Sequence, residues 1–292
     1  MRPFDYYAPE NLDEAFSLLD QFGEKAKVLA GGTDLLVNLR AGLLHPSCLI
    51  DISNIASLRQ ITEDRDWLRI GAGLTHAEVE SSTLVQEQVP LLVEAVRTIG
   101  APQTRNLGTL GGNLASGLPS SDTAPPLLAL DARMKIVSSK GMRILLLTDF
   151  FRGPKETVLK ADEILTEILV PKRERLGMGR YLKLGRRKAV SLAVVGVAVW
   201  MDIDRDRRKF QEVRIALGAV SPTPVRAKEG EAFLSGKEIE MEVIEEGARL
   251  VSGEAHPIDD FRASADYRKE MVRVLTRRGV ESCLNRLGVA TG

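Results

Sequence analysis

The chain has 292 residues, of which 44% are hydrophobic and 27% are charged, a composition ordinary for a soluble globular protein. The length suits about two domains of roughly 150 residues each. Forty basic and forty acidic residues give a formal net charge of zero, which argues against nucleic acid or a membrane surface as a partner bound through charge.

The two cysteines, Cys48 and Cys283, lie far apart and neither belongs to a CxxC motif. The chain is therefore expected to hold no metal and no iron–sulfur cluster of its own, and two buried free thiols are predicted. So few cysteines are typical of a cytoplasmic protein. The opening residues lack a signal-peptide pattern, and the longest apolar run, residues 192–201, is too short to span a membrane.

Residues 1–55 are predicted to form a small α/β unit. Asn11 followed by Glu14 is a capping-box pattern that opens a helix, and Gly23 ends it. Two strands follow, KVLA at 27–30 and CLIDIS at 48–53, separated by a glycine turn and an apolar segment.

Residues 56–175 are predicted to form a second unit. Two strands joined by an acidic turn lead to a capping box at Thr75 and Glu78, and a helix follows Pro90. Residues 101–125 are rich in Gly, Pro, Ser, Asn and Thr, and an ordered loop of this length is usually functional. A hairpin is expected around Lys140 and Gly141, with a last strand at 163–171.

Residues 176–292 are predicted to form an α+β domain. The segments YLKLG, LAVVGVAVWMDI and VRIALGAVS read as a three-stranded antiparallel sheet, and helices are expected at 226–235, 239–252 and 267–287. The predicted division of the chain is thus 1–55, 56–175 and 176–292.

Two glycine turns are the segments most suggestive of chemistry, AGGTDLL at 30–36 and TLGGN at 109–113. A phosphate-binding turn needs backbone N–H groups that converge on an anion and side chains that stay out of the way, and glycine satisfies both needs. Neither turn is a GxGxxG fingerprint or a P-loop. Each taken singly also fits a tight turn without a ligand.

Taken as an ordered pair, the turns resemble those of the FAD-binding subunit of the xanthine dehydrogenase and carbon monoxide dehydrogenase family of molybdenum hydroxylases. The resemblance covers essentially the whole chain, including FDYYAPENLDEAFSLL, GAGLTHAEV, VRTIGAPQTRNLGTLGGNLASGLPSSDTAPPLLAL, EILTEILVP, YLKLGRRKAVSLAVV and SADYRKEMVRVLTRR. It implies an FAD-binding domain of the vanillyl-alcohol-oxidase (PCMH) type with two subdomains, followed by a C-terminal domain like that of the carbon monoxide dehydrogenase flavoprotein.

The resemblance also implies which residues would contact FAD. The first turn would lie at the pyrophosphate, and the second at the phosphates and the ribityl chain. Ile99 takes the place of an aromatic residue beside the flavin ring. The implied residues are Leu29, Ala30, Gly31, Gly32, Thr33, Asp34, Leu35, Ile99, Thr109, Gly111, Gly112, Asn113, Asp122, Leu165 and Lys183.

Three of these residues have an alternative role that the sequence leaves open. Asp122 can also cap a turn, Leu165 fits a strand core, and Lys183 fits a solvated strand position. His76, next to the capping Thr75, is interpreted as structural.

The function implied is electron relay without a catalytic acid or base in this chain. Molybdopterin would hydroxylate the substrate in a large subunit, 2Fe–2S clusters would lie in a small subunit, and FAD would pass electrons to NAD or another acceptor. A stand-alone PCMH-type flavin oxidase or reductase, a scaffold without FAD, and a carbon monoxide dehydrogenase medium subunit are the alternatives.

Departures from the family's patterns narrow the prediction. The chain lacks the cysteine-rich insertion that is typical of 4-hydroxybenzoyl-CoA reductases. Carbon monoxide dehydrogenases usually have AGGHS where this chain reads AGGTD, and a Tyr where it has Leu192. We therefore expect a purine or another N-heterocycle as the substrate of the complex.

Overall fold

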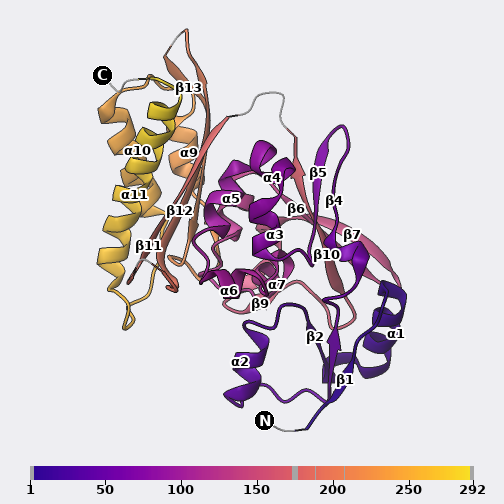
Figure 1. The fold of residues 1–292 in the computed structure, drawn as a ribbon. Coiled ribbons are helices and arrows are strands. Elements are labelled where there is room, and N and C mark those ends of the chain that lie inside the picture. Colours follow the sequence, from indigo (N-terminus) through magenta and orange to yellow (C-terminus); the bar gives the residue numbers. More distant parts are fainter. Residues whose placement is uncertain (1–2, 173–176, 188, 207, 290–292) are drawn as a thin grey trace.

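A computed structural model describes residues 3–172, 177–187, 189–206 and 208–289. Three sheets follow one another along the chain, and a two-stranded ribbon of β8 (Phe151–Gly153) and β9 (Glu156–Thr157) accompanies them. Figure 1 shows the four-stranded sheet between the C-terminal helices on one side and the central helices on the other.

The first sheet is parallel, with β3 between β1 and β2. The predicted helix is confirmed at both ends, because Asn11 Oδ1 accepts a hydrogen bond from Glu14 N at 3.0 Å and the helix stops at Gly23. The elements are β1 (Asp5–Tyr7), α1 (Leu12–Phe22), the 3₁₀ turn η1 (Gly23–Lys25), β2 (Ala26–Leu29), α2 (Leu35–Arg40) and β3 (Cys48–Asp51).

The second sheet is antiparallel, in the order β4-β5-β10-β6-β7. The predicted hairpin is confirmed, with Ser138 paired to Gly141. The strands are β4 (Ile61–Glu63), β5 (Trp67–Gly71), β6 (Arg133–Ser138), β7 (Gly141–Leu146) and β10 (Ile164–Pro171), and the 3₁₀ turns are η2 (Ala56–Arg59) and η3 (Leu147–Asp149).

Short helices cover one side of this sheet. They are α3 (His76–Ser81), α4 (Thr83–Gln88), α5 (Pro90–Val96), α6 (Pro102–Arg105), α7 (Leu110–Ala115) and α8 (Ala124–Ala129). The prediction of an irregular loop at 101–125 was therefore wrong in part. Pro102 begins α6 and Thr109 caps α7, so residues that are disfavoured inside a helix here start very short helices.

The third sheet has the order β11-β12-β13-β14 and is antiparallel. The three predicted strands are confirmed, and the two-residue strand β14 adds a fourth that the sequence did not reveal. The elements are β11 (Met178–Gly185), β12 (Ala193–Asp204), β13 (Lys209–Gly218), β14 (Val225–Arg226), α9 (Lys228–Leu234), α10 (Met241–Gly253) and α11 (Ala265–Arg286).

Both faces of β12 are buried, which explains its apolar sequence. Val197, Val199 and Met201 belong to the core that the sheet shares with α9–α11, whereas Ala198 and Trp200 belong to the core shared with the central helices. Alternate residues thus face different partners. No helix in the described part of the chain is long and apolar enough to cross a membrane.

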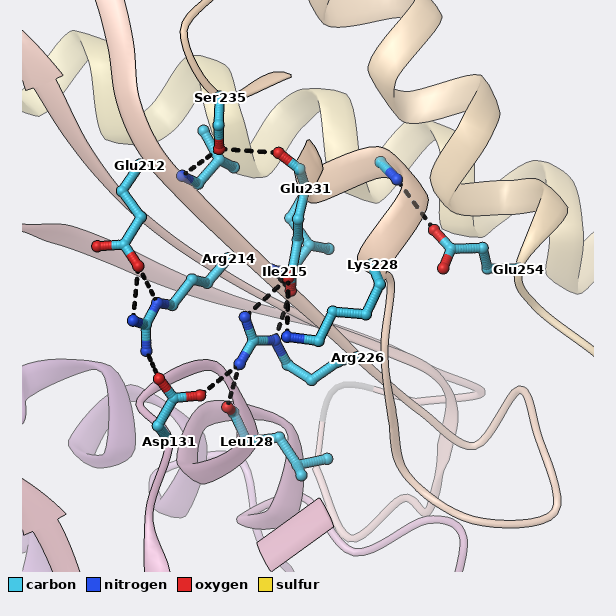
Figure 2. A network of polar contacts seen from close by, with 12 residues as sticks. Leu128, Asp131, Glu212, Arg214, Ile215, Arg226, Lys228, Glu231, Ser235 and Glu254 are labelled. Atoms are coloured by element: carbon cyan, nitrogen blue, oxygen red, sulfur yellow. Dashed lines mark hydrogen bonds and ion pairs between the residues drawn. The ribbon is translucent and has the colours of Figure 1, made fainter. Parts of the chain in front are cut away.

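A cluster of charged side chains ties the third sheet to the loop after α8 (Figure 2). Arg226 Nη1 lies 2.6 Å from Asp131 Oδ1, and its Nη2 donates to Glu231 Oε2 at 2.8 Å. Arg214 also forms an ion pair with Asp131. The side chains of Arg226 and Glu231 are almost fully buried. This cluster therefore belongs to the interface between the third sheet and the part of the molecule that contains α8.

Candidate cofactor-binding site

The first glycine turn lies against residues 107 and 108, which directly precede the second turn. A Cβ built on Gly31 would lie 1.9 Å from the carbonyl oxygen of Leu107, so only glycine allows this approach. A Cβ built on Gly108 would lie 3.4 Å from Thr33 Oγ1. Gly32 has a φ of +70°, in the left-handed region. The structure therefore brings two segments together that are nearly eighty positions apart in the sequence.

The first turn has free hydrogen-bond donors. Within the described residues, the backbone N–H groups of Gly31, Gly32, Thr33 and Asp34 donate to no acceptor. These groups directly precede α2, whose first residue is Leu35. Successive unpaired N–H groups at the start of a helix form a concavity that favours an anion such as a phosphate.

The second turn is different, because the N–H groups of residues 110–113 are already used. Leu110 N donates to Leu74 O at 2.9 Å, Gly111 N to Ala72 O at 2.8 Å, and Asn113 N to Thr109 O at 3.0 Å. Gly112 N donates to the Thr109 hydroxyl at 3.0 Å. The expectation that this turn repeats the phosphate-binding arrangement of the first was therefore wrong at the level of backbone donors.

What the second turn offers instead is a close-fitting surface and one amide. A Cβ on Gly111 would lie 2.6 Å from Ala72 Cβ, whereas a Cβ on Gly112 would meet only the Thr109 hydroxyl, at 2.8 Å. Asn113 Oδ1 accepts hydrogen bonds from Ser121 and Thr123, both at 2.6 Å. These two bonds fix the amide, and its Nδ2 donates to nothing in the described chain.

Asp122 and Lys183 form a buried ion pair, 2.7 Å between Oδ2 and Nζ, with each side chain 8% exposed. Lys183 Nζ also donates to the Thr98 carbonyl at 3.1 Å. Burial raises the pKa of Asp122, and the neighbouring Lys183 counteracts that rise. Asp122 is thus no simple turn cap, and Lys183 is not a solvated strand residue.

Ile99 and Leu165 supply apolar surface. Ile99 follows Thr98, whose carbonyl binds Lys183, and its side chain is 9% exposed. Leu165 is buried in β10, next to Thr166, whose carbonyl accepts from Ala72 N. Ala72 in turn accepts from Gly111 N. Ile99 therefore adjoins the ion pair. Leu165 is linked to the second turn through Ala72, the residue that follows β5.

Two residues close to these segments were not predicted to lie at the site. Tyr181 donates its hydroxyl to Asp122 Oδ1 at 2.8 Å; its position two residues before Lys183, on the same face of β11, was the available signal. His76 N donates to Gly108 O at 2.9 Å, and the His76 Nδ1 is buried with no partner among the described residues. The structural interpretation of His76 fits, but its place beneath the glycine turns was not foreseen.

The arrangement fits a long ligand with an anionic middle and a flat apolar end. Free N–H groups lie at Gly31 to Asp34, a fixed amide lies at Asn113, and a neutralised charge pair adjoins Ile99. In the described residues there is no group of three or more His, Cys, Asp or Glu side chains that could hold a metal. The free N–H groups, the amide and the apolar side chains together suit an organic cofactor.

Comparison with known proteins agrees with this geometry. Residues 2–173 match the family described as "FAD binding domain in molybdopterin dehydrogenase", and residues 180–283 match the "CO dehydrogenase flavoprotein C-terminal domain". The carbon monoxide dehydrogenase medium chain of Hydrogenophaga pseudoflava is 36% identical over 96% of each chain. The xanthine dehydrogenase FAD-binding subunit of Escherichia coli O157:H7 is 31% identical over 97% of each chain.

Solved structures have the same fold. Carbon monoxide dehydrogenase from Hydrogenophaga pseudoflava, in a form that lacks the Mo-pyranopterin moiety, matches with a TM-score of 0.94 over 98% of this chain and 99% of that chain, at 36% identity. This agreement extends over both regions that the two family descriptions match. The chain belongs to the family of FAD-binding medium subunits of molybdenum hydroxylases of the xanthine dehydrogenase and carbon monoxide dehydrogenase type.

Proposed function

We propose that this chain holds FAD against the two glycine turns and the Asp122–Lys183 pair, and that it relays electrons within a molybdenum hydroxylase complex. The observation that carries this proposal is the run of free N–H groups from Gly31 to Asp34, closed on one side by the backbone of Leu107. Family membership then supplies the identity of the ligand.

Each group of residues has a distinct part in holding the cofactor. The free N–H groups of the first turn would bind the pyrophosphate, because four successive donors there have no other acceptor among the described residues and two of them belong to glycines. Asn113 would donate its Nδ2 to the phosphates or the ribityl chain. Ile99 and Leu165 would present apolar surface to the ring, beside the Asp122–Lys183 pair. The remaining contacts implied by the family, Leu29, Ala30, Thr109 and Leu35, lie in or beside these same turns.

When bound, FAD supplies the chemistry of taking up single electrons and releasing a pair. The chain's own task is to orient the ring and to fix the charges around it. Lys183 and Asp122 neutralise each other at 2.7 Å, so the ring would meet a dipole rather than a net charge. That no residue of the chain acts as a catalytic acid or base stays part of this proposal.

The kind of complex follows from the family. The individual partner subunits, the compartment and the electron acceptor are part of the proposal. The chain would dock with a molybdopterin-binding large subunit and a 2Fe–2S small subunit in the cytoplasm, and NAD would be the acceptor. The relatives above are named for carbon monoxide and xanthine at 36% and 31% identity, so overall similarity does not choose a substrate. We propose a purine or another N-heterocycle as the substrate of the complex. The reason is that Thr33-Asp34 and Leu192 differ from the residues that carbon monoxide dehydrogenases usually have at these places.

The test is flavin binding by the full-length chain. Wild-type protein should bind FAD with the visible spectrum of a flavoprotein. Gly32→Val and Gly112→Val should each abolish binding, because the added Cβ atoms would lie 3.0 Å from Leu36 and 2.8 Å from Thr109 and so displace the turns that would hold the ligand. Gly236→Val is the matched control, because Gly236 has a φ of +83° and nothing within 4 Å of its Cβ.

Two results would contradict the proposal. A colourless wild-type protein that ignores added FAD would remove its basis, and so would normal flavin content in both turn variants. Turnover of a purine by the purified chain without partners would instead favour the stand-alone flavoenzyme.

A further inference from the structure

We propose that Tyr181 is a positioning residue for this site: its hydroxyl, which reaches Asp122 only because residue 196 is glycine, fixes the Asp122 carboxylate and through it the Lys183 ammonium. The C-terminal sheet would thereby set the charge geometry beside the flavin. This inference rests on the proposed function and adds a residue that the glycine turns and the ion pair do not include.

The contacts divide the carboxylate between two donors. Tyr181 Oη donates to Asp122 Oδ1 at 2.8 Å, and Lys183 Nζ donates to Oδ2 at 2.7 Å. Tyr181 is 6% exposed, and the Asp122 and Lys183 side chains are each 8% exposed. A carboxylate that is held at both oxygens in a buried place has one orientation, whereas a carboxylate held only by a lysine can rotate around its ion pair.

The position of the two donors follows from the strand. Tyr181 and Lys183 are two residues apart on β11, so their side chains leave the same face of the sheet. That face packs against the cofactor-binding part of the chain, because Tyr181 belongs to the same core as Ile99, Leu110 and Leu114. One strand of the C-terminal sheet therefore delivers both donors to a carboxylate of the other domain.

Gly196 is the third member of this arrangement. It lies opposite Lys183 in the ladder between β11 and β12. A Cβ built on Gly196 would lie 2.8 Å from Tyr181 Oη, yet 3.5 Å and 3.6 Å from the nearest ring carbons, Cζ and Cε2. Only the hydroxyl needs the space that this glycine leaves, because the ring carbons are at ordinary contact distance. Glycine weakens a strand interior and often marks such a close approach.

The first experiment compares Tyr181→Phe with wild type in the full-length chain loaded with FAD. Removing the hydroxyl leaves Asp122 Oδ1 buried without a donor, so the pair should shift and the flavin should report it. We expect FAD still to bind with a Kd about tenfold weaker, together with a displaced visible spectrum and a changed midpoint potential. Tyr6→Phe is the matched control, because Tyr6 donates to Asp51 at 2.6 Å on the exposed surface.

The second experiment tests the fit at Gly196, and its first readout, the unfolding temperature, does not depend on FAD. Gly196→Ala should lower the unfolding temperature and alter the flavin as Tyr181→Phe does, because its methyl group displaces the hydroxyl. In the double variant Tyr181→Phe/Gly196→Ala the clash is gone. The unfolding temperature should return to that of Tyr181→Phe, while the flavin spectrum and potential stay altered.

The outcomes separate this proposal from the one on which it rests. If the wild-type chain takes up no FAD, the proposed function itself fails. If it takes up FAD and Tyr181→Phe lowers only the unfolding temperature, with unchanged Kd, spectrum and potential, then Tyr181 is merely structural and the positioning role is overturned. Equal destabilisation by Gly196→Ala with and without the Tyr181 hydroxyl would overturn the role of Gly196.

Discussion

His76 is a residue whose burial has a measurable consequence for stability. Burial, and to a lesser extent the charge of Arg105, lowers its pKa from 6.5 to about 4. As the pH falls, the unfolded chain takes up this proton first, so stability is complete above pH 6.5 and is lost progressively towards pH 4. The loss should amount to roughly 2 kcal/mol between pH 7.5 and 5.

Urea unfolding of wild type and His76→Gln at several pH values measures this effect. The two proteins should differ in the slope of unfolding free energy against pH between pH 6.5 and 4, with the wild type losing more as the pH falls. His45→Gln, at an exposed histidine, should keep the wild-type slope. Parallel slopes for wild type and His76→Gln would show that His76 is not the titrating group.

Single residues were predictable from the sequence when a local pattern identified them. The capping pairs at Asn11 and Thr75 needed only neighbours three positions away, and both residues cap their helices. The reciprocal box is complete at Thr75, whereas the Glu14 carboxylate accepts from Glu10 N instead of Asn11 N. Asp122 and Lys183 came from resemblance, and only the structure shows that they are partners. Tyr181 was missed because a tyrosine in an apolar strand is equally typical of a core.

At the scale of elements, periodicity identified the long helices and strands and missed the short ones. Helix α11 and strand β12 have many residues over which a pattern accumulates. Helices α6, α7 and α8 have only 4, 6 and 6 residues, and they exist because tertiary hydrogen bonds such as Gly111 N to Ala72 O support them. The division of the chain at residues 55 and 175 stays a prediction.

The contact of α11 with the third sheet depends on one glycine. A Cβ on Gly279 would lie 2.8 Å from Val199 Cγ2, and a β-branched side chain in a core has little freedom to move. Gly279→Ala should therefore lower the free energy of unfolding by about 1–3 kcal/mol, although alanine is the better helix former. Chemical denaturation measures the difference.

The matched control lies on the neighbouring helix. Gly253, the last residue of α10, has nothing within 4 Å of its built Cβ. Gly253→Ala should raise stability by less than about 1 kcal/mol, from helix propensity alone. If both variants stabilise the protein, the helix does not need glycine to reach the sheet.

At the scale of the whole molecule, the sequence did not predict how the C-terminal sheet packs against the cofactor-binding part. Arg214 and Arg226 lie 83 and 95 residues from Asp131, and no local pattern links charges so far apart. Composition gave only a formal net charge of zero. Figure 2 shows that some of the charged side chains pair with one another inside the interface between the two parts.

Arg226 is the centre of that cluster, and its loss should weaken the whole molecule. It donates to Asp131 Oδ1 at 2.6 Å, to the Leu128 carbonyl at 3.1 Å and to Glu231 Oε2 at 2.8 Å. Glu231 also accepts from Ile215 N at 2.9 Å and is 6% exposed. Arg226→Met leaves this buried carboxylate with only the exposed Lys228, 3.4 Å away, as its cation, so the loss should approach the cost of a broken buried pair, about 3–5 kcal/mol.

A double-mutant cycle separates this cost from simple loss of packing. Arg226→Met/Glu231→Gln removes the uncompensated charge, so it should recover part of the stability that Arg226→Met loses. Asp131→Asn, at a half-exposed carboxylate, should cost no more than about 1 kcal/mol. If Arg226→Met costs no more than Asp131→Asn in thermal or urea unfolding, the buried pair does not fasten the C-terminal sheet to the cofactor-binding part.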